Sequence, residues 1–158
     1  PESCMPVQYE YTGYAWKPEL RKEQTFLREK WDFSRYQPDV VCINLGTNDL
    51  STPNYDLALL KQSYQKFLKL VRQHNPKAKI VLLTGSMLYN QELQIAKQLL
   101  DELTDKAHKA GDQEVYRFDM NHIDGEAFLG NDWHPNVYQD EKMANELTAY
   151  LRKLMNWF

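Results

Sequence analysis

The sequence predicts an α/β fold built on a parallel sheet. Three short apolar runs, residues 40–45, 80–84 and 115–118, have the length and composition of strands that are covered on both faces. Each run is followed along the chain by a stretch with helical periodicity, and this alternation produces a parallel sheet with right-handed crossovers. A chain of 158 residues is long enough for one domain with its own core. Because three strands make a thin sheet for this architecture, we expect a further strand that these runs do not supply.

The three helices are predicted from apolar stripes and from their end signals. Asn54 can cap a helix over residues 54–74, and Gly111 can stop a second helix over residues 91–110. Asn136 can cap the last helix. We expect the following side chains to face the core: Leu57, Leu60, Tyr64, Phe67, Leu68 and Val71; Leu93, Ala96, Leu99, Leu100 and Leu103; and Val137, Met143, Leu147, Leu151 and Leu154.

The first 30 residues lack a regular pattern, so we treat residues 1–30 as an irregular N-terminal segment and residues 31–158 as the domain. Within that segment, residues 1–18 are rich in Pro, Tyr and Gly and are expected to be extended or looped. Residues 19–30 are strongly charged and are expected to form a short exposed helix.

Composition and charge argue against several classes of function. The formal net charge is -3, so the chain lacks the excess of positive charge that binding to nucleic acid or to an anionic membrane surface requires. No apolar run approaches the roughly 18 residues of a membrane-spanning helix. The two cysteines, Cys4 and Cys42, do not have metal-ligand spacing, and we predict no metal and no cofactor. A disulfide between them is compatible with the sequence, but Cys42 lies in an apolar strand and is expected to be a small buried hydrophobe.

The motif Gly46-Thr47-Asn48-Asp49 directly follows the first strand, at the sheet edge where parallel α/β proteins bind ligands. The side-chain amide of Asn48 can donate a hydrogen bond to an oxyanion that forms during ester cleavage. Gly46 would let the backbone turn sharply and leave room for substrate, and the Asp49 carboxylate would fix the loop by accepting backbone N–H groups. The same residue types also favour an ordinary strand-to-helix turn, and both interpretations stay open.

The second motif, Asp132-Trp133-His134-Pro135, precedes the last helix and contains one of the four histidines. His74 and His108 lie near helix C-termini and are expected to face solvent, whereas His122 lies in the connecting loop without an assigned place. His134 differs because the proline after it stiffens the backbone, and a rigidly held imidazole suits general-base chemistry. A loop histidine with a structural hydrogen bond is the alternative.

The residues before His134 can assist it. The Asp132 carboxylate, if hydrogen-bonded to the imidazole, would select its tautomer and orient it. A spacing of two residues makes this contact feasible, and a solvent-facing or substrate-binding Asp132 stays open. Trp133 is a large apolar neighbour of the imidazole.

With these motifs the chain resembles the SGNH (GDSL-type) esterase superfamily and, within it, the carbohydrate esterase family 2 acetyl-xylan esterases. Three segments carry the resemblance: WDFSRYQPDVV followed by INLGTND in residues 31–49, GSML in residues 85–88, and NDWHPN in residues 131–136. The resemblance covers residues 31–156. It implies a flavodoxin-like three-layer sandwich that lacks its first strand in this chain, with residues 31–158 as the C-terminal part of the domain. It also implies that Asn48 is an oxyanion-hole donor and His134 the catalytic base, and that Trp133 binds substrate by stacking on a sugar ring.

Two departures from the family pattern matter. The Gly-Asp-Ser nucleophile block has no counterpart here, and Ser86, at the correct sheet edge, lacks the second glycine of a nucleophile elbow. We expect Ser86 to cap the segment that follows it. Asn131 stands where the superfamily commonly has an aspartate three residues before the histidine. Some family-2 esterases orient the histidine through a backbone carbonyl, so a dyad and a triad both stay open.

The leading hypothesis is a carbohydrate O-acetyl esterase that deacetylates xylan or a related plant polysaccharide by Ser-His catalysis. The serine would lie outside this chain, in an N-terminal part of the domain that associates with these residues. The resemblance implies an extracellular location. The alternative is a catalytically inert carbohydrate-binding or interaction domain on the same scaffold. A flavodoxin-like regulatory domain is a weaker reading, because an acidic cluster and a phosphate-binding glycine loop are missing.

Overall fold

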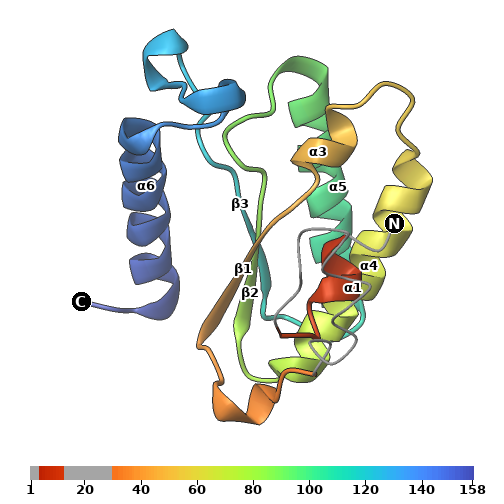
Figure 1. The fold of residues 1–158 in the computed structure, drawn as a ribbon. Coiled ribbons are helices and arrows are strands. Elements are labelled where there is room, and N and C mark those ends of the chain that lie inside the picture. The colour runs from red at the N-terminus through yellow and green to blue at the C-terminus, as the bar shows by residue number, and fades with distance from the viewer. Residues whose placement is uncertain (1–3, 13–29) are drawn as a thin grey trace, which may run out of the picture.

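The computed structural model describes residues 4–12 and 30–158, and within them the predicted parallel sheet is confirmed. Strands β1 (Val40–Asn44), β2 (Lys79–Leu83) and β3 (Val115–Phe118) pair in parallel in the order β1-β2-β3 (Figure 1). Each strand begins and ends within one residue of its predicted bounds. All three carboxyl ends therefore lie at one edge of the sheet.

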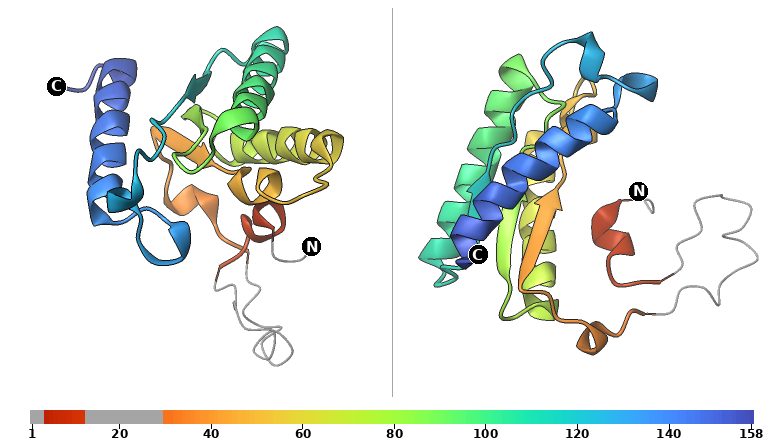
Figure 2. Two further views of the ribbon diagram at one scale, coloured as in Figure 1. Left: turned by 90° about the horizontal axis from the view of Figure 1, so that it is seen from above. Right: turned by 90° about the vertical axis from the view of Figure 1, so that its left-hand side faces the viewer.

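Helices cover the sheet on both faces and make a three-layer α/β sandwich, as predicted. Helices α4 (Leu57–His74) and α5 (Asn90–Lys109) pack on one face, and α6 (Val137–Met155) lies along the other (Figure 2). The buried core forms between the sheet and the first two helices. Its members are Ile43, Tyr64, Phe67, Leu68, Val71, Ile80, Leu82, Leu99, Leu100, Leu103 and Val115. Burying such a side chain contributes roughly 1.5–3 kcal/mol, so this layer dominates the stability of the fold.

The helix caps agree with the sequence at two of the three predicted positions. Gly111 follows α5 with a φ of 95° and ends it, and the Asn136 side chain accepts hydrogen bonds from the first-turn N–H groups of α6. The prediction that Asn54 caps α4 was wrong. Asp56 is the cap, because its carboxylate accepts from Leu59 N at 2.9 Å, and the helix starts two residues later than a cap at Asn54 would place it.

The buried stripe of α6 differs from the predicted one in its first turn. Val137 was expected to face the core but is 73% exposed, whereas Gln139 is fully buried. The cap at Asn136 fixes the rotation of the helix, which turns residue 139 and, one turn later, Met143 toward the sheet. The buried amide of Gln139 has no hydrogen-bond partner for its nitrogen or its oxygen. This polar group costs stability, so its burial needs an explanation.

The α6 layer does not extend over β1. Cys42, Val81 and Tyr116 are neighbours in register across the three strands and share one sheet face. Val81 is fully buried but Cys42 is exposed, so the expectation of a buried Cys42 was wrong. Both Cys42 and Cys4 are free thiols, and partial burial raises the pKa of the Cys42 thiol. In the described part of the chain, the outer edge of β1 has no partner strand.

The N-terminal residues that the structure describes differ from expectation. Residues Met5–Gln8 form one turn of helix, α1, where an extended or looped chain was expected, and this turn packs against α4. The helix predicted for residues 19–30 lies almost entirely outside the described residues, and the division at residue 30 stays a prediction. Over the described ranges, no helix is long and apolar enough to cross a membrane.

The two helix-end histidines are half-buried, not solvent-facing as predicted. The His74 ring stacks on Phe33 with centroids 3.8 Å apart, and its Nε2 lies 2.9 Å from a Glu10 carboxylate oxygen. His108 Nε2 lies 2.8 Å from the main-chain oxygen of Val115. Both rings therefore link neighbouring segments of the chain at a distance from the carboxyl edge of the sheet.

Candidate active site

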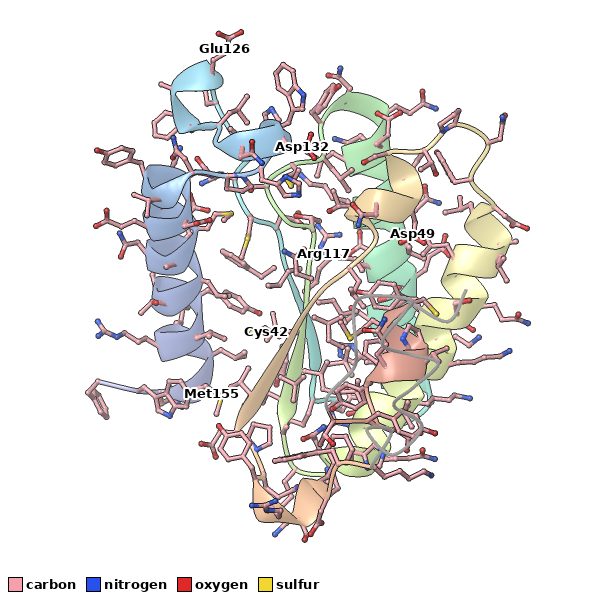
Figure 3. The ribbon with its side chains drawn as sticks, in the orientation of Figure 1. Cys42, Asp49, Arg117, Glu126, Asp132 and Met155 are labelled. Atoms are coloured by element: carbon pink, nitrogen blue, oxygen red, sulfur yellow. The ribbon has the colours of Figure 1, made fainter. Side chains whose placement is uncertain are left out.

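The two motifs singled out in the sequence lie at the same end of the sheet. The short helix α3 (Thr47–Leu50) stands at the carboxyl end of β1, and the turn η4 (Asn131–Trp133) stands above β2 and β3. Figure 3 shows Asp49 and Asp132 on these two elements, both at the carboxyl edge. Asn48 also belongs to α3, and His134 directly follows η4, so both residues belong to segments at this edge.

The turn after β1 is built by a glycine and a buried leucine. Gly46 has a φ of 108°, in the left-handed region, and an added Cβ would meet no atom within 4 Å. The turn therefore requires glycine for backbone conformation, not for space. Leu50, 2% exposed, anchors the other end of the turn by packing in a small cluster with Leu88 and Ala96. Asn48, between these two points, is exposed and available to a ligand.

Asp49 does not fix this turn in the way the sequence suggested. Its carboxylate accepts no hydrogen bond from any described residue; instead its main-chain oxygen accepts from the Thr52 hydroxyl at 2.9 Å. Burial of Leu50 provides the anchor that had been assigned to Asp49. The Asp49 side chain, like that of Asn48, is exposed at the edge.

Asn44 is a further polar residue at this edge that the sequence analysis missed. It is the last residue of β1, and its side chain is exposed on the face that α6 leaves open. Gly85 has a φ of 71°, and a Cβ there would lie 2.8 Å from Asn44 Oδ1, so the glycine makes room for this amide. A polar residue inside an otherwise apolar strand is the signal that could have identified it.

The loop that carries His134 is closed by backbone hydrogen bonds. Gly130 N donates to His134 O at 2.6 Å, and Asn136 N donates to Phe128 O at 2.9 Å. The Asn136 side chain donates to Ala127 O at 2.8 Å while its oxygen caps α6. One asparagine thus ties the loop to the helix, which fixes the backbone immediately after the imidazole.

Two consecutive left-handed residues set the direction of the imidazole. Asp132 has φ 53° and ψ 43°, and Trp133 has φ 62°. Each such conformation costs about 1–2 kcal/mol for a residue other than glycine, and strain of this kind concentrates at functional sites. Here it brings the Asp132 main-chain oxygen to 2.8 Å from His134 Nδ1 and leaves Trp133 72% exposed.

This contact determines the tautomer of His134. A carbonyl oxygen can only accept, so Nδ1 must carry the hydrogen that it donates. The second ring nitrogen, Nε2, then keeps its lone pair and can accept a proton. The sequence predicted that Asp132 would orient the ring through its carboxylate. The structure instead makes the contact through the carbonyl, and the carboxylate is exposed without a hydrogen bond to a described residue.

Ser86 has neither the predicted role nor the geometry of a nucleophile. It is 3% exposed, and its hydroxyl donates to the Met143 sulfur at 2.9 Å. Tyr89 occupies the cap position of α5, so the prediction that Ser86 caps the following segment was wrong. Among the residues described, no three His, Cys, Asp or Glu side chains group as ligands for a metal ion.

Comparison with known proteins places these features in a family. A family model described as GDSL-like lipase/acylhydrolase matches residues 13–147. The chain is 36% identical over 128 residues to the cellulase/esterase CelE of Acetivibrio thermocellus, covering 81% of this chain and 16% of that protein. It is 32% identical over 128 residues to an acetylxylan esterase/glucomannan deacetylase of Cellvibrio japonicus, covering 81% of this chain and 34% of that protein.

The fold is similar to that of solved family-two carbohydrate esterases. A Clostridium thermocellum enzyme of this kind, solved in complex with cellohexaose, superposes with a TM-score of 0.77 at 36% identity, over 82% of this chain and 40% of that one. The chain therefore spans less than half the length of each of these relatives. The family model matches most of the sequence, including both motifs at the carboxyl edge, and the chain belongs to the GDSL-like lipase/acylhydrolase family.

Proposed function

We propose that these residues form part of a carbohydrate O-acetyl esterase that uses Ser-His catalysis, with the serine outside this chain. The observation that carries the proposal is the 2.8 Å contact between His134 Nδ1 and the Asp132 carbonyl, which leaves Nε2 as a base at the carboxyl edge. The family membership supports acyl-ester chemistry, and the similarity to acetylxylan esterases supports an acetylated polysaccharide substrate.

The proposed reaction proceeds in two halves. His134 Nε2 removes the proton of the serine hydroxyl as its oxygen attacks the acetyl carbonyl, and the Asn48 amide donates to the resulting oxyanion. The imidazolium then protonates the departing sugar oxygen, which leaves an acetyl-serine. Water attacks this ester with the same imidazole as base, and acetate and free serine are released.

Three further residues at the edge, Trp133, Asp49 and Gly46, would contribute to the substrate site. Trp133 presents a large aromatic face beside His134 and would stack on a sugar ring. Gly46 leaves open space above the turn, and Asp49 could accept hydrogen bonds from sugar hydroxyls. Xylan or a related plant polysaccharide is the proposed substrate, and an extracellular location follows from the nature of such a polymer.

The proposed serine-bearing segment would bind at the edge of β1. The outer edge of β1 is unpaired within the described residues, and Cys42 and Asn44 are exposed on the adjoining face. An unpaired, partly apolar edge favours addition of another strand. We infer that the segment with the serine associates along this edge, where its end would reach the level of Asn48 and His134.

The test is covalent labelling with a fluorophosphonate probe together with acetate release from acetylated xylan, using the complete encoded domain. The proposal predicts one labelled serine upstream of residue 1 and release of acetate that labelling abolishes. Binding to xylan without labelling and without acetate would instead indicate the inert carbohydrate-binding alternative.

A further inference from the structure

We propose that Asn44 is a positioning residue of the candidate site, and that its side-chain amide holds the turn that carries the catalytic serine. The inference rests on the proposed function, in which the serine lies outside this chain and its segment adds to the edge of β1. Asn44 is the last residue of β1, two positions before Gly46, and its side chain is exposed. It takes no part in the proton transfers or in the contact with the oxyanion.

The amide of Asn44 has no structural partner in the described part of the chain. Its side chain makes no hydrogen bond there, in contrast to the amides of Asn75 and Asn136, which hold main-chain groups at helix ends. Asparagine is also one of the residues that are depleted in strands. A side chain that disfavours the strand and stabilises nothing near it is the pattern expected of a functional position.

Gly85, in the loop after β2, allows this amide to keep its position. A Cβ at residue 85 would lie 2.8 Å from Asn44 Oδ1 and 3.5 Å from Asn44 Nδ2, and the φ of 71° is itself one that favours glycine. The main chain of Gly85 therefore lies against the oxygen side of the amide and restricts its rotation. Because Nδ2 is the farther of the two atoms, the donor is the group that is left for a partner.

The direction of the strands places Asn44 beside the turn that would follow a strand added to β1. Asn44 is in register with Leu83, the last residue of β2, so it stands at the common carboxyl edge of the sheet. A strand that runs parallel to β1 along its free edge ends at this same level. The chain that leaves this strand then passes the end of β1 to bring its serine toward Asn48 on α3 and His134 after η4 (Figure 1).

A turn at the end of a strand leaves main-chain carbonyls without partners in the sheet, and a side-chain N–H group can satisfy one of them. The Asn44 Nδ2 donates to such a carbonyl in the serine turn. This contact matters for the reaction because the serine oxygen has to lie within about 2.6–3.2 Å of His134 Nε2 for proton transfer. A displacement of about 1 Å can cost on the order of 10²-fold in rate. The amide thus fixes the serine relative to the imidazole.

The kinetic test compares Asn44→Leu with Cys42→Ala in the complete domain. Leucine has the approximate shape of asparagine but cannot donate a hydrogen bond. Cys42 is the matched control, because it is exposed on the same face of β1, about 7 Å farther from the edge (Figure 3).

Asn44→Leu should lower kcat on acetylated xylan about 10- to 100-fold while KM stays within about twofold of wild type. Labelling of the serine by the fluorophosphonate probe should slow by a similar factor, because it requires the same attack by the serine oxygen. Cys42→Ala should change neither rate. Asn44→Ser, whose hydroxyl is a donor, should recover part of the loss. If Asn44→Leu does not fold, Asn44→Ala provides the same comparison.

A double-mutant cycle with Gly85→Ala tests the contact between the glycine and the amide. The added Cβ displaces the Asn44 side chain, so Gly85→Ala alone should lower kcat. In an Asn44→Ala background the same change should have little further effect, because the amide is already absent.

The inference would be overturned if kcat and the labelling rate of Asn44→Leu stay within about twofold of Cys42→Ala, or if Gly85→Ala lowers kcat equally in both backgrounds. The proposed function would stand in these cases, since the wild-type domain would still be labelled and would still release acetate. A wild-type domain without a labelled serine would overturn both the proposed function and the role of Asn44.

Discussion

The main-chain oxygen of Asp132 and the Nδ1 atom of His134 lie 2.8 Å apart, and this contact is formed without the Asp132 carboxylate. It depends on left-handed backbone at Asp132 and Trp133, which turns the carbonyl back toward the ring two residues later. The orienting group of the candidate site is therefore part of the main chain, so it cannot be removed by a side-chain substitution that keeps the backbone conformation.

This relationship predicts that the Asp132 carboxylate contributes little to catalysis. Asp132→Asn preserves the backbone, because asparagine tolerates the left-handed region well. We expect kcat on acetylated xylan to stay within a few-fold of wild type. In a triad, the corresponding change costs about 10⁴-fold. A loss of that size in steady-state kinetics, with the fold intact by circular dichroism, would assign the orienting role to the carboxylate.

Asn48 is expected to act on the transition state. Removing a single oxyanion donor typically costs about 2.7–4 kcal/mol, which appears as a loss of about 10²–10³ in kcat. Asn48→Ala in the complete domain should show this loss with little change in melting temperature, because the side chain is exposed and makes no hydrogen bond to a described residue. Asn145→Ala, at an exposed position of α6, is the control. Equal activity of the two variants would exclude the assignment.

Gln139 is expected to cost stability. Its amide is fully buried and both polar atoms lack partners. Replacing an unsatisfied buried amide with an apolar side chain of similar shape removes a penalty of about 1–3 kcal/mol. Gln139→Met should therefore raise the free energy of unfolding in urea, whereas Gln94→Met, at an exposed position of α5, should not. A destabilised Gln139→Met would show that the amide has a partner, such as a buried water, in solution.

Cys42 reports on the uncovered face of β1. In a Cys4→Ser background, the exposed thiol of the 158-residue chain should react with N-ethylmaleimide. The thiolate is the nucleophile, and partial burial raises the pKa of this thiol. The alkylation rate should therefore increase with pH along a titration curve whose midpoint lies above that of an ordinary cysteine. If a further strand covers this face in the complete domain, alkylation there should be on the order of tenfold slower or more, since it requires local opening. Equal rates would mean that β1 stays uncovered.

The fold could be predicted from the sequence because its periodic signals are strong and local. The strands begin and end close to their apolar runs, and Asn136 caps α6 as its position suggested. The errors arise where tertiary context decides. Val137 is exposed although it was predicted to face the core, and Gln139 is buried, because the cap sets the rotation of α6. Cys42 is exposed because the third layer does not cover β1.

The sequence predicted the edge of the sheet at which the two motifs lie, but not the local geometry of their backbone. The two motifs mark the carboxyl edge, since parallel strands place their ends together. The carbonyl contact to His134 could not be predicted, because no residue type signals left-handed backbone at both Asp132 and Trp133. The hydrogen bond from the Ser86 hydroxyl to the Met143 sulfur could not be predicted either, because the two residues are 57 positions apart in the sequence.

The most direct test is the rate of acetate release by His134→Ala in the complete domain, with acetylated xylan as substrate. If His134 Nε2 is the base, the rate should fall by at least about 10²–10⁴-fold, the typical contribution of general acid–base catalysis, while melting temperature and xylan binding are retained. Acetate release within twofold of wild type would contradict the proposed mechanism at its centre.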